Sequence, residues 1–322
     1  MNFKKIIVTG GCGFIGSNFI SYILNKYKYI KLLNIDALTY AANNNLNSEF
    51  KKFKNYKFKK INLKNFTILK KTIYNFKPDA VFHFAAESHV DNSIKNPDKF
   101  LSSNINGTVN LLKVIDKKVK LFHISTDEVF GHVIDNKAFS ETTNYNPRSP
   151  YSASKASADF FVKAWANTYG LDYIIIHCCN NYGPNQNKEK FIPKIINSLK
   201  NKRKIPLYGN GKQKREWIYV LDFVKAIEFI ANKKIKNQNI MVGSKYGIRN
   251  KDLIYLIKDI MQKKFGYRNS NKIIKHVADR PGHDFEYKIN FNKLKKLGWR
   301  NNFNIKEGLE RTIRYYLKID DK

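Results

Sequence analysis

The chain has 322 residues, of which 43% are hydrophobic, and this is enough for one large globular domain or two ordinary ones. No apolar run approaches the roughly 18 residues of a membrane span, and residues 1–5 lead into a strand-like run without a signal-peptide profile. Cys12, Cys178 and Cys179 show no CxxC spacing, which argues against a disulfide framework. We therefore expect a cytoplasmic protein with no membrane partner.

The formal net charge of +33 raises the question of a nucleic-acid partner. Only nine of the 59 basic residues are arginine, and the lysines are scattered through every segment. Nucleic-acid sites favour clustered arginines and recognisable modules, and the sequence shows neither. We therefore expect no specific nucleic-acid partner, and keep a basic binding protein as an alternative.

A strand, a glycine-rich turn and a helix follow one another at the start of the chain. Residues 5–9 form a short apolar run, and an apolar-periodic helix extends to about Lys26. Between them, Gly10, Gly13 and Gly16 allow a tight turn, close approach of a pyrophosphate and packing of the helix on the sheet. The helix N-terminus offers its N–H groups to the anion. This pattern predicts a dinucleotide site.

The next strand, residues 32–36, ends in Asp36, twenty positions after Gly16. An acid at this place suits a ribose 2′-hydroxyl and would repel a 2′-phosphate, so the pattern favours NAD over NADP. The alternative is a helix or turn cap.

Further strand-like runs alternate with helical stretches, which predicts an α/β fold with a parallel sheet covered on both faces. The runs are residues 56–61, 80–84, 121–124 and 173–177. Ligands bind at the carboxyl ends of such strands. The turns after Phe84 and Ser125 and an expected turn at residues 180–182 should therefore share one edge.

Two acids follow the strand at residues 121–124. Thr126, Asp127 and Glu128 stand in succession there, and burying an unpaired carboxylate costs several kcal/mol unless it faces a ligand. The alternative is a solvated turn.

Tyr151 and Lys155 lie one turn apart on a helix expected from about Pro150 to Thr168, so they share a face. A neighbouring ammonium favours phenolate, which predicts a lowered pKa for Tyr151, as a general base requires. An ordinary exposed pair is the alternative, and the dinucleotide pattern upstream argues against it.

These motifs together resemble a known family. Residues 9–16 and 151–155 resemble the extended short-chain dehydrogenase/reductase family. Within it, four blocks are similar to the dTDP-glucose 4,6-dehydratases, and they lie at residues 85–91, 125–129, 180–184 and 279–284. The Thr-Asp-Glu run is the specific element, because the related sugar-nucleotide 4-epimerases lack that acid pair.

The resemblance covers essentially the whole chain and implies a Rossmann-type doubly wound parallel sheet with a smaller C-terminal α/β substrate domain. We expect residues 1–182 to form the NAD-binding domain and residues 183–322 the sugar-nucleotide-binding domain, with residues 218–231 returning to the first. The last helix is expected at residues 305–317. A homodimer through helices that flank the nucleotide domain is also implied.

The resemblance implies a lyase that removes water from a nucleotide-linked glucose and recycles NAD. Tyr151 would take the 4-hydroxyl proton while NAD takes the hydride from C4, with Thr126 hydrogen-bonding the same oxygen. Glu128 would remove the C5 proton, and Asp127 would protonate the departing 6-hydroxyl. Hydride return to C6 and proton return to C5 would complete the 4-keto-6-deoxyglucose. Crowding by Glu128 and removal from water would raise the pKa of Asp127 for this role.

Binding residues carry over by motif. The NAD site would include Gly10, Gly13, Ile15, Gly16, Asp36, Leu38, Thr39, Asn62, Leu63, Ala85, Ala86, Ser103, Tyr151, Lys155 and Asn181. The substrate site would include Ser88, Thr126, Asn180, Lys190, Phe191, Pro206, Tyr208, Arg215, Asn250, Arg280 and His283. Arg215 and Arg280 can grip a diphosphate in a bidentate manner, and Tyr208 can lie against a base.

Some questions stay open in the sequence. Asn62-Leu63 stands where the family usually has Asp-Ile, which puts that cofactor contact in doubt. UDP-glucose is the alternative substrate to dTDP-glucose, and a sugar-nucleotide 4-epimerase is the next alternative function. The histidines show no metal-ligand spacing, so we predict no metal.

Overall fold

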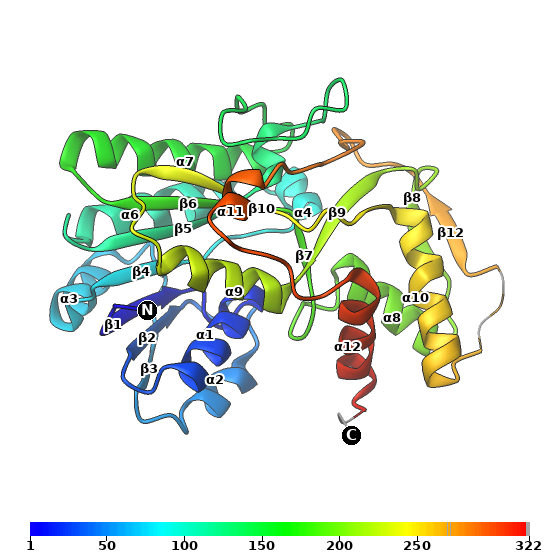
Figure 1. Ribbon diagram of the computed structural model, residues 1–322, viewed down its shortest axis with the longest axis horizontal. Coiled ribbons are helices and arrows are strands. Elements are labelled where there is room, and N and C mark those ends of the chain that lie inside the picture. Colours follow the sequence, from blue (N-terminus) through cyan, green and yellow to red (C-terminus); the bar gives the residue numbers. More distant parts are fainter. Residues whose placement is uncertain (269, 271, 320–322) are drawn as a thin grey trace.

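Seven parallel strands form the main sheet of the protein, in the order β10-β6-β5-β4-β1-β2-β3 (Figure 1). The computed structural model describes residues 1–268, 270 and 272–319. The strands are β1 (Lys5–Thr9), β2 (Lys31–Asp36), β3 (Tyr56–Lys60), β4 (Ala80–His83), β5 (Lys120–Thr126), β6 (Tyr173–Cys178) and β10 (Gln238–Val242). The strand order reverses direction between β1 and β4, which is where an open parallel sheet forms a crevice for a ligand. The predicted doubly wound α/β fold is confirmed.

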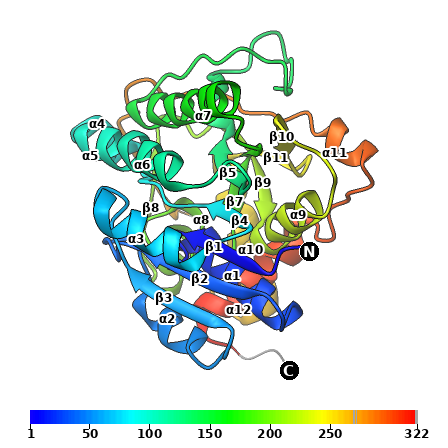
Figure 2. The same cartoon turned by 90° about the vertical axis from the view of Figure 1, so that its left-hand side faces the viewer.

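Helices cover both faces of this sheet, as Figure 2 shows along the strands. One face carries α1 (Phe14–Lys26), α2 (Asn44–Phe50) and α9 (Val220–Ala231), and the other carries α3 (Phe66–Phe76), α6 (Gly107–Val114) and α7 (Pro150–Tyr169). Each face has its own buried apolar cluster. The inner strands are therefore buried on both sides, which is why they read as hydrophobic runs in the sequence, whereas the edge strand β3 exposes Lys57, Lys59 and Lys60.

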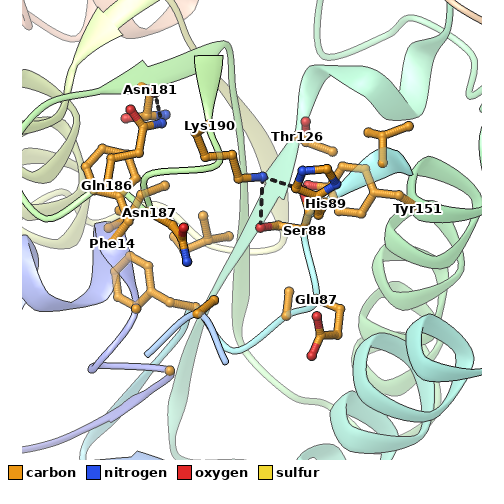
Figure 3. Close-up of a pocket in the computed structure, with 18 of the residues that line it drawn as sticks. Phe14, Glu87, Ser88, His89, Thr126, Tyr151, Asn181, Gln186, Asn187 and Lys190 are labelled. Carbon is orange, nitrogen blue, oxygen red and sulfur yellow. Dashed lines mark hydrogen bonds between the residues drawn. The ribbon is translucent and has the colours of Figure 1, made fainter. Parts of the chain in front are cut away.

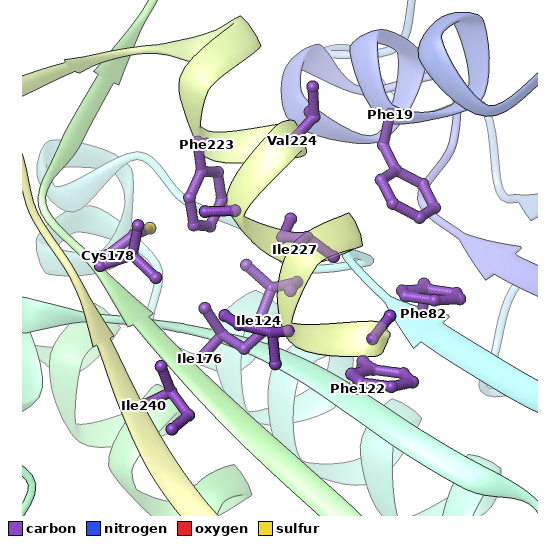
Figure 4. Packing of buried hydrophobic residues seen from close by; sticks show 14 of the residues in the cluster. Phe19, Phe82, Phe122, Ile124, Ile176, Cys178, Phe223, Val224, Ile227 and Ile240 are labelled. Carbon is purple, nitrogen blue, oxygen red and sulfur yellow. The ribbon is translucent and has the colours of Figure 1, made fainter. Parts of the chain in front are cut away.

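Helix α9 seals the middle of the sheet. Its residues Phe223 and Ile227 point toward Ile124 and Ile176, whereas Val224 points toward α1, as Figure 4 shows, and all of them except Ile124 are completely buried. Complete burial of an aliphatic side chain contributes about 1.5–3 kcal/mol relative to exposure. This packing fixes β5 and β6, whose carboxyl ends enter the cleft.

A smaller lobe stands beyond the carboxyl ends of the strands (Figure 1, right). Its sheets consist of β7 (Asn180–Tyr182), β9 (Lys214–Tyr219) and β11 (Gly247–Arg249), and of β8 (Ile205–Tyr208) and β12 (Ile274–Val277). Its helices are α8 (Phe191–Lys200), α10 (Asn250–Phe265) and α12 (Ile305–Leu317). A capping box of Asn304 and Glu307 starts α12. The lobe has a separate apolar core formed by α8, α10 and α12.

Short helices complete the chain. They are α4 (Val90–Lys95), α5 (Asp98–Phe100), a π-helical stretch (Leu101–Asn106), a 3₁₀ turn (Asp127–Phe130) and α11 (Asn292–Lys296). Within the described ranges, no helix combines the length and apolar character that crossing a bilayer requires.

The structure differs from the sequence-based expectation in two places. Residues 180–182, expected as a turn, form strand β7, which pairs with β9. Residues 240–242, expected in the smaller lobe, belong to β10 and extend the main sheet beside β6. Tyr287, Leu294 and Trp299 also pack into the core of the larger lobe. The predicted domain boundary at residue 182 stays a prediction. In the structure, β10 and the segment from Tyr287 to Trp299 belong to the larger lobe although they follow that boundary.

Candidate active site

A cleft of about 610 Å³ runs between the lobes at the carboxyl ends of the strands. Nearly all predicted site residues line it, namely Gly10, Gly13, Ile15, Gly16, Asp36, Thr39, Asn62, Leu63, Ala85, Ala86, Ser88, Ser103, Thr126, Asp127, Glu128, Tyr151, Lys155, Asn180, Asn181, Lys190, Phe191, Pro206, Tyr208, Arg215 and Arg280. Leu38, Asn250 and His283 are not among the residues that line it. The structure therefore brings together residues as far apart in the chain as Gly10 and Arg280.

The glycine turn is shaped by close backbone contacts. Gly10 has a φ of +71°, and a Cβ there would lie 2.6 Å from the backbone nitrogen of Ala85. A Cβ on Gly16 would lie 2.4 Å from the Gly10 carbonyl oxygen. Gly13 starts α1 without a side-chain cap from any described residue, so the first N–H groups of the helix are available to an anion.

Asp36 is fixed at the end of β2 by two backbone N–H groups. Cys12 N donates to its Oδ2 at 2.9 Å, and Leu38 N donates to its Oδ1 at 2.7 Å. A carboxylate has about four lone-pair sites, so it can still accept from ribose hydroxyls. Leu38, predicted as a lining residue, instead holds this carboxylate through its backbone. The turn and Asp36 together fit NAD.

Strand β5 delivers the predicted acid pair to the cleft, because it ends at Thr126 and continues as a 3₁₀ turn. The Thr126 hydroxyl donates to Asp127 Oδ1 at 3.3 Å. Asp127 is 1% exposed, and no described residue donates a hydrogen bond to its Oδ2. Burial and the neighbouring carboxylates of Glu128 and Glu216 raise the pKa of Asp127 well above its ordinary value.

Glu128 stands in a different electrostatic environment. Burial raises its pKa, while the cationic groups of Arg280, Arg215 and Lys190 oppose this shift. These three cations come from the smaller lobe and converge on one carboxylate. Glu128 is therefore the acid of the pair that more readily stays ionised, and Asp127 the one that more readily stays protonated.

Tyr151 and Lys155 lie on the first turns of α7, which begins at a capping box of Ser149 and Ser152. Lys155 Nζ donates to the Ile124 carbonyl oxygen at 2.7 Å. Burial and the Glu128 carboxylate raise the pKa of Tyr151 well above its ordinary value, so the predicted lowering by Lys155 is wrong. The spacing on the helix gave the shared face correctly, but it could not show that a strand carbonyl holds the ammonium.

Two basic residues contact the opposite wall of the cleft. Lys190 Nζ donates to the carbonyl oxygen of Ser88 at 2.8 Å, and Figure 3 shows this side chain reaching toward Ser88 and His89. Arg280 Nη1 lies 3.6 Å from Asp91 Oδ1. Both contacts join the smaller lobe to the segment that follows β4.

Arg215 is less available than the sequence suggested. It donates to the backbone oxygens of Lys214, Phe285 and Asp284 at 2.7–3.1 Å, and its guanidinium lies 4.2 Å from the Tyr287 ring centre. Three of its five N–H donors are thus occupied, which restricts the bidentate grip expected for this residue. Its charge still acts on Asp127 and Glu128.

The structure also places residues in the cleft that the sequence reasoning missed. Glu87 and Asp91 lie within a motif that was singled out, so their signal was present but unused. Glu189 stands beside the predicted Lys190. Tyr287 also lines the cleft, and no pattern in the sequence marked it.

Known proteins resemble this chain in sequence and in fold. The family model for GDP-mannose 4,6 dehydratase matches residues 7–312. A dTDP-glucose 4,6-dehydratase of Escherichia coli is 39% identical, over 97% of this chain and 93% of its own length.

Solved structures agree with this. A dTDP-glucose 4,6-dehydratase from Streptomyces venezuelae, solved with NAD, superposes with a TM-score of 0.91 at 35% identity, covering 98% of this chain and 97% of its own. A UDP-glucose 4-epimerase from Thermotoga maritima has a TM-score of 0.88 at 27% identity, covering 98% and 99%. The fold is common to both activities, but the relatives at higher sequence identity are dehydratases. The chain belongs to the 4,6-dehydratase family described by the matching model, and within it to the dTDP-glucose 4,6-dehydratases.

Proposed function

We propose that this enzyme converts dTDP-glucose to dTDP-4-keto-6-deoxyglucose and water with NAD as its cofactor. The relatives named for this reaction match almost the whole chain, and a solved neighbour carries NAD. UDP-glucose as the substrate has less support, because these relatives are named for dTDP-glucose.

The unequal acid pair carries the proposal. An elimination needs a base for one proton and an acid for the leaving hydroxyl at the same time. Glu128 faces the cations of the smaller lobe, whereas Asp127 is buried with one carboxyl oxygen that receives no hydrogen bond from the part of the chain that the structure describes. An epimerase needs only the reversible oxidation, for which the paired acids would have no use.

Each catalytic side chain has a proposed task. Tyr151 accepts the proton of the 4-hydroxyl as its phenolate, a form that the Lys155 ammonium and the positive charge of bound NAD would favour against the effect of burial, and Thr126 holds the same oxygen. Glu128 removes the C5 proton and later returns one there. Asp127 protonates the 6-hydroxyl so that it leaves as water. Lys155, held by the Ile124 carbonyl, places a positive charge beneath these groups.

NAD, when bound, supplies the oxidation at C4 and the reduction at C6. Gly13 and the N-terminus of α1 would hold its pyrophosphate, and Asp36 would accept from the adenosine ribose. Arg280 and Lys190 would bind the substrate diphosphate, because both reach the cleft from the smaller lobe, whereas the donors of Arg215 are largely occupied by backbone oxygens.

The test is direct. Purified enzyme with NAD is incubated with dTDP-glucose and, separately, with UDP-glucose, and the products are analysed by mass spectrometry. We expect a product lighter by one water from dTDP-glucose. A stereoisomer of unchanged mass would indicate an epimerase, and intact substrate in both reactions would contradict the proposal.

A homodimer and a cytoplasmic location are proposals as well. Exposed apolar side chains on α7 and on the π-helical stretch that packs beside it support the dimer, and they include Leu101, Phe160, Phe161 and Tyr169. Monomers that expose such a surface commonly use it for association. Light scattering should give twice the mass of the chain. The buried free cysteines are compatible with a reducing compartment.

A further inference from the structure

We propose that Asp91 is a positioning residue that holds Tyr208 and Arg280 across the mouth of the cleft, so that the nucleoside diphosphate end of the substrate meets a preformed site. This inference rests on the proposed function, since it concerns how the same substrate is bound. None of the catalytic tasks given above uses Asp91.

Asp91 connects the two lobes. It belongs to α4, which follows β4 of the main sheet, whereas Tyr208 ends β8 of the smaller lobe. The Tyr208 hydroxyl donates to Asp91 Oδ2 at 2.9 Å, and Arg280 Nη1 lies 3.6 Å from Asp91 Oδ1. All three residues line the cleft. One carboxylate therefore fixes two substrate-binding side chains from the other lobe.

The Tyr208 ring is fixed at a second point. Its centre lies 6.1 Å from the ring centre of His283 in an edge-on arrangement. His283 Nδ1 lies 2.6 Å from Asp279 Oδ1, and Gln213 donates to the other oxygen of Asp279 at 2.8 Å. With its hydroxyl held by Asp91 and its ring packed against His283, the Tyr208 side chain is restrained at two points. A nucleobase can stack on a ring restrained in this way without the entropy cost of immobilising the side chain.

His283 thereby gains a role that differs from the predicted one. The sequence assigned it to the substrate site, but it does not line the cleft and instead supports Tyr208 from behind. Asp91 and Asp279 thus affect substrate binding indirectly, by positioning Tyr208, Arg280 and His283.

A carboxylate beside a diphosphate site needs a physical reason. By itself it would repel the substrate, and like charges at close range cost affinity. The Asp91–Arg280 contact is long, at 3.6 Å, so the guanidinium keeps donors for a phosphate while its position is restrained. Orientation gained before binding lowers the entropy cost of binding.

The arrangement is not part of the fold's support. The Asp91 side chain is 29% exposed and that of Arg280 is 21% exposed, and neither residue belongs to the three apolar cores. Partly exposed ion pairs contribute little to global stability. Loss of Asp91 should therefore change substrate binding while leaving the unfolding transition in place.

The experiment compares Asp91→Ala and Asp91→Asn with Asp98→Ala in the NAD-bound enzyme. Asp98 is an exposed acid on the neighbouring α5, so its removal changes the net charge equally without touching the cleft. dTDP binding is measured by calorimetry, and KM and kcat with dTDP-glucose. We expect Asp91→Ala to weaken dTDP and raise KM roughly tenfold, the loss of about one hydrogen bond, with kcat within about twofold.

Asp91→Asn keeps an acceptor for Tyr208 and should lose less affinity than Asp91→Ala. Tyr208→Phe removes the same hydrogen bond from the donor side. The Asp91→Ala/Tyr208→Phe double variant should therefore bind dTDP about as well as the weaker of the two single variants, and clearly better than the product of the two single losses. NAD affinity and thermal unfolding should match the wild type in all of these proteins.

The outcomes separate the two proposals. If the wild type binds dTDP and dehydrates dTDP-glucose, but Asp91→Ala binds dTDP equally or more tightly, Asp91 does not position the site and the inference is overturned. Multiplicative losses in the double variant would overturn it too. If the wild type neither binds dTDP nor releases water, the proposed function itself fails.

Discussion

Asp127 and Asp159 are both buried carboxylates next to the end of β5, but they differ in the hydrogen-bond donors and charges around them. Asp159 Oδ2 accepts from Ser125 at 2.8 Å and Tyr145 at 3.2 Å and lies 3.1 Å from His177 Nε2, while Oδ1 lies 3.2 Å from His123 Nε2. Asp127 receives one weak hydrogen bond and has an oxygen without any donor among the described residues.

The two pKa values move in opposite directions as a result. Burial raises both pKa values, but the two histidine rings and the hydrogen bonds to Oδ2 outweigh it and lower the pKa of Asp159, whereas the neighbouring acids raise that of Asp127 further. Since Ser125 precedes Asp127 by two residues, the same strand end supports one ionised acid and one that favours its proton. The comparison shows that burial alone does not mark a catalytic acid. What distinguishes Asp127 is that few hydrogen-bond donors surround its buried carboxyl group.

The largest effect is expected from Glu128→Gln. This change keeps the shape of the side chain but removes the base for the C5 proton, so elimination should slow by about 10²–10⁴-fold. Oxidation at C4 needs Tyr151 rather than Glu128, so NADH absorbance should accumulate when dTDP-glucose is added. Turnover near that of the wild type would place the base elsewhere.

Asp127→Asn should separate activity from stability. The amide cannot donate an acid proton, so water loss should also fall by about 10²–10⁴-fold. At neutral pH the folded protein should become slightly more stable, because a buried acid with a raised pKa destabilises the fold when it ionises. Chemical denaturation at pH 7 measures this, and a clear loss of stability would show that the Asp127 carboxylate supports the fold.

Asp159→Asn should give the opposite result. It leaves His123, His177 and Tyr145 facing an amide that cannot accept from all of them. Removing one partner of a buried charged pair costs about 3–5 kcal/mol, so the free energy of unfolding should fall by about this amount. Activity per folded molecule should fall less than in Asp127→Asn, and equal catalytic losses would break the distinction between the two acids.

The smallest effect concerns the pH dependence of stability. Burial lowers the pKa of His123 from its ordinary value of 6.5 to about 4. Between these values the unfolded chain holds more protons at this position than the folded protein, so stability falls by roughly 3 kcal/mol as the pH is lowered through the window. Urea denaturation between pH 7 and about 4 should show this slope.

Two variants sharpen the pH measurement. His123→Gln should reduce the slope, because one of the two fully buried histidines that gain a proton on unfolding is gone and His83 remains. Asp127→Asn should steepen it, because the raised pKa of Asp127 makes the folded protein hold more protons than the unfolded chain as the pH falls toward the ordinary value of 3.8. Identical slopes in all three proteins would contradict both assignments.

Local patterns in the sequence predicted much of this structure. The glycine turn, the strand ending at Asp36, the Tyr151 helix and the last helix were all placed within a residue or two. Each is encoded by periodicity, caps and turn residues that act over a few positions. The acid pair was also found in this way, because its residues are adjacent.

The features that were missed depend on distant partners. Strand β10 joins the main sheet because β6 offers a free edge, and nothing near residue 240 encodes that choice. The pKa of Tyr151 depends on Glu128, and Lys155 is held by a carbonyl of β5. Asp91 acquires its contacts only when Tyr208, 117 positions away, and the still more distant Arg280 fold against it.

The route of the chain through β10 has a consequence for engineering. After entering the smaller lobe, the chain returns through α9 and β10, leaves again, and comes back near α11 before ending in α12 (Figure 1). A fragment that stops at residue 182 would expose the sheet where Ile227 and Ile240 now pack. Neither lobe can therefore be exchanged between homologues as one continuous segment of sequence. Substrate preference must be altered by substitutions inside an intact chain, and a chimera would need three separate grafts.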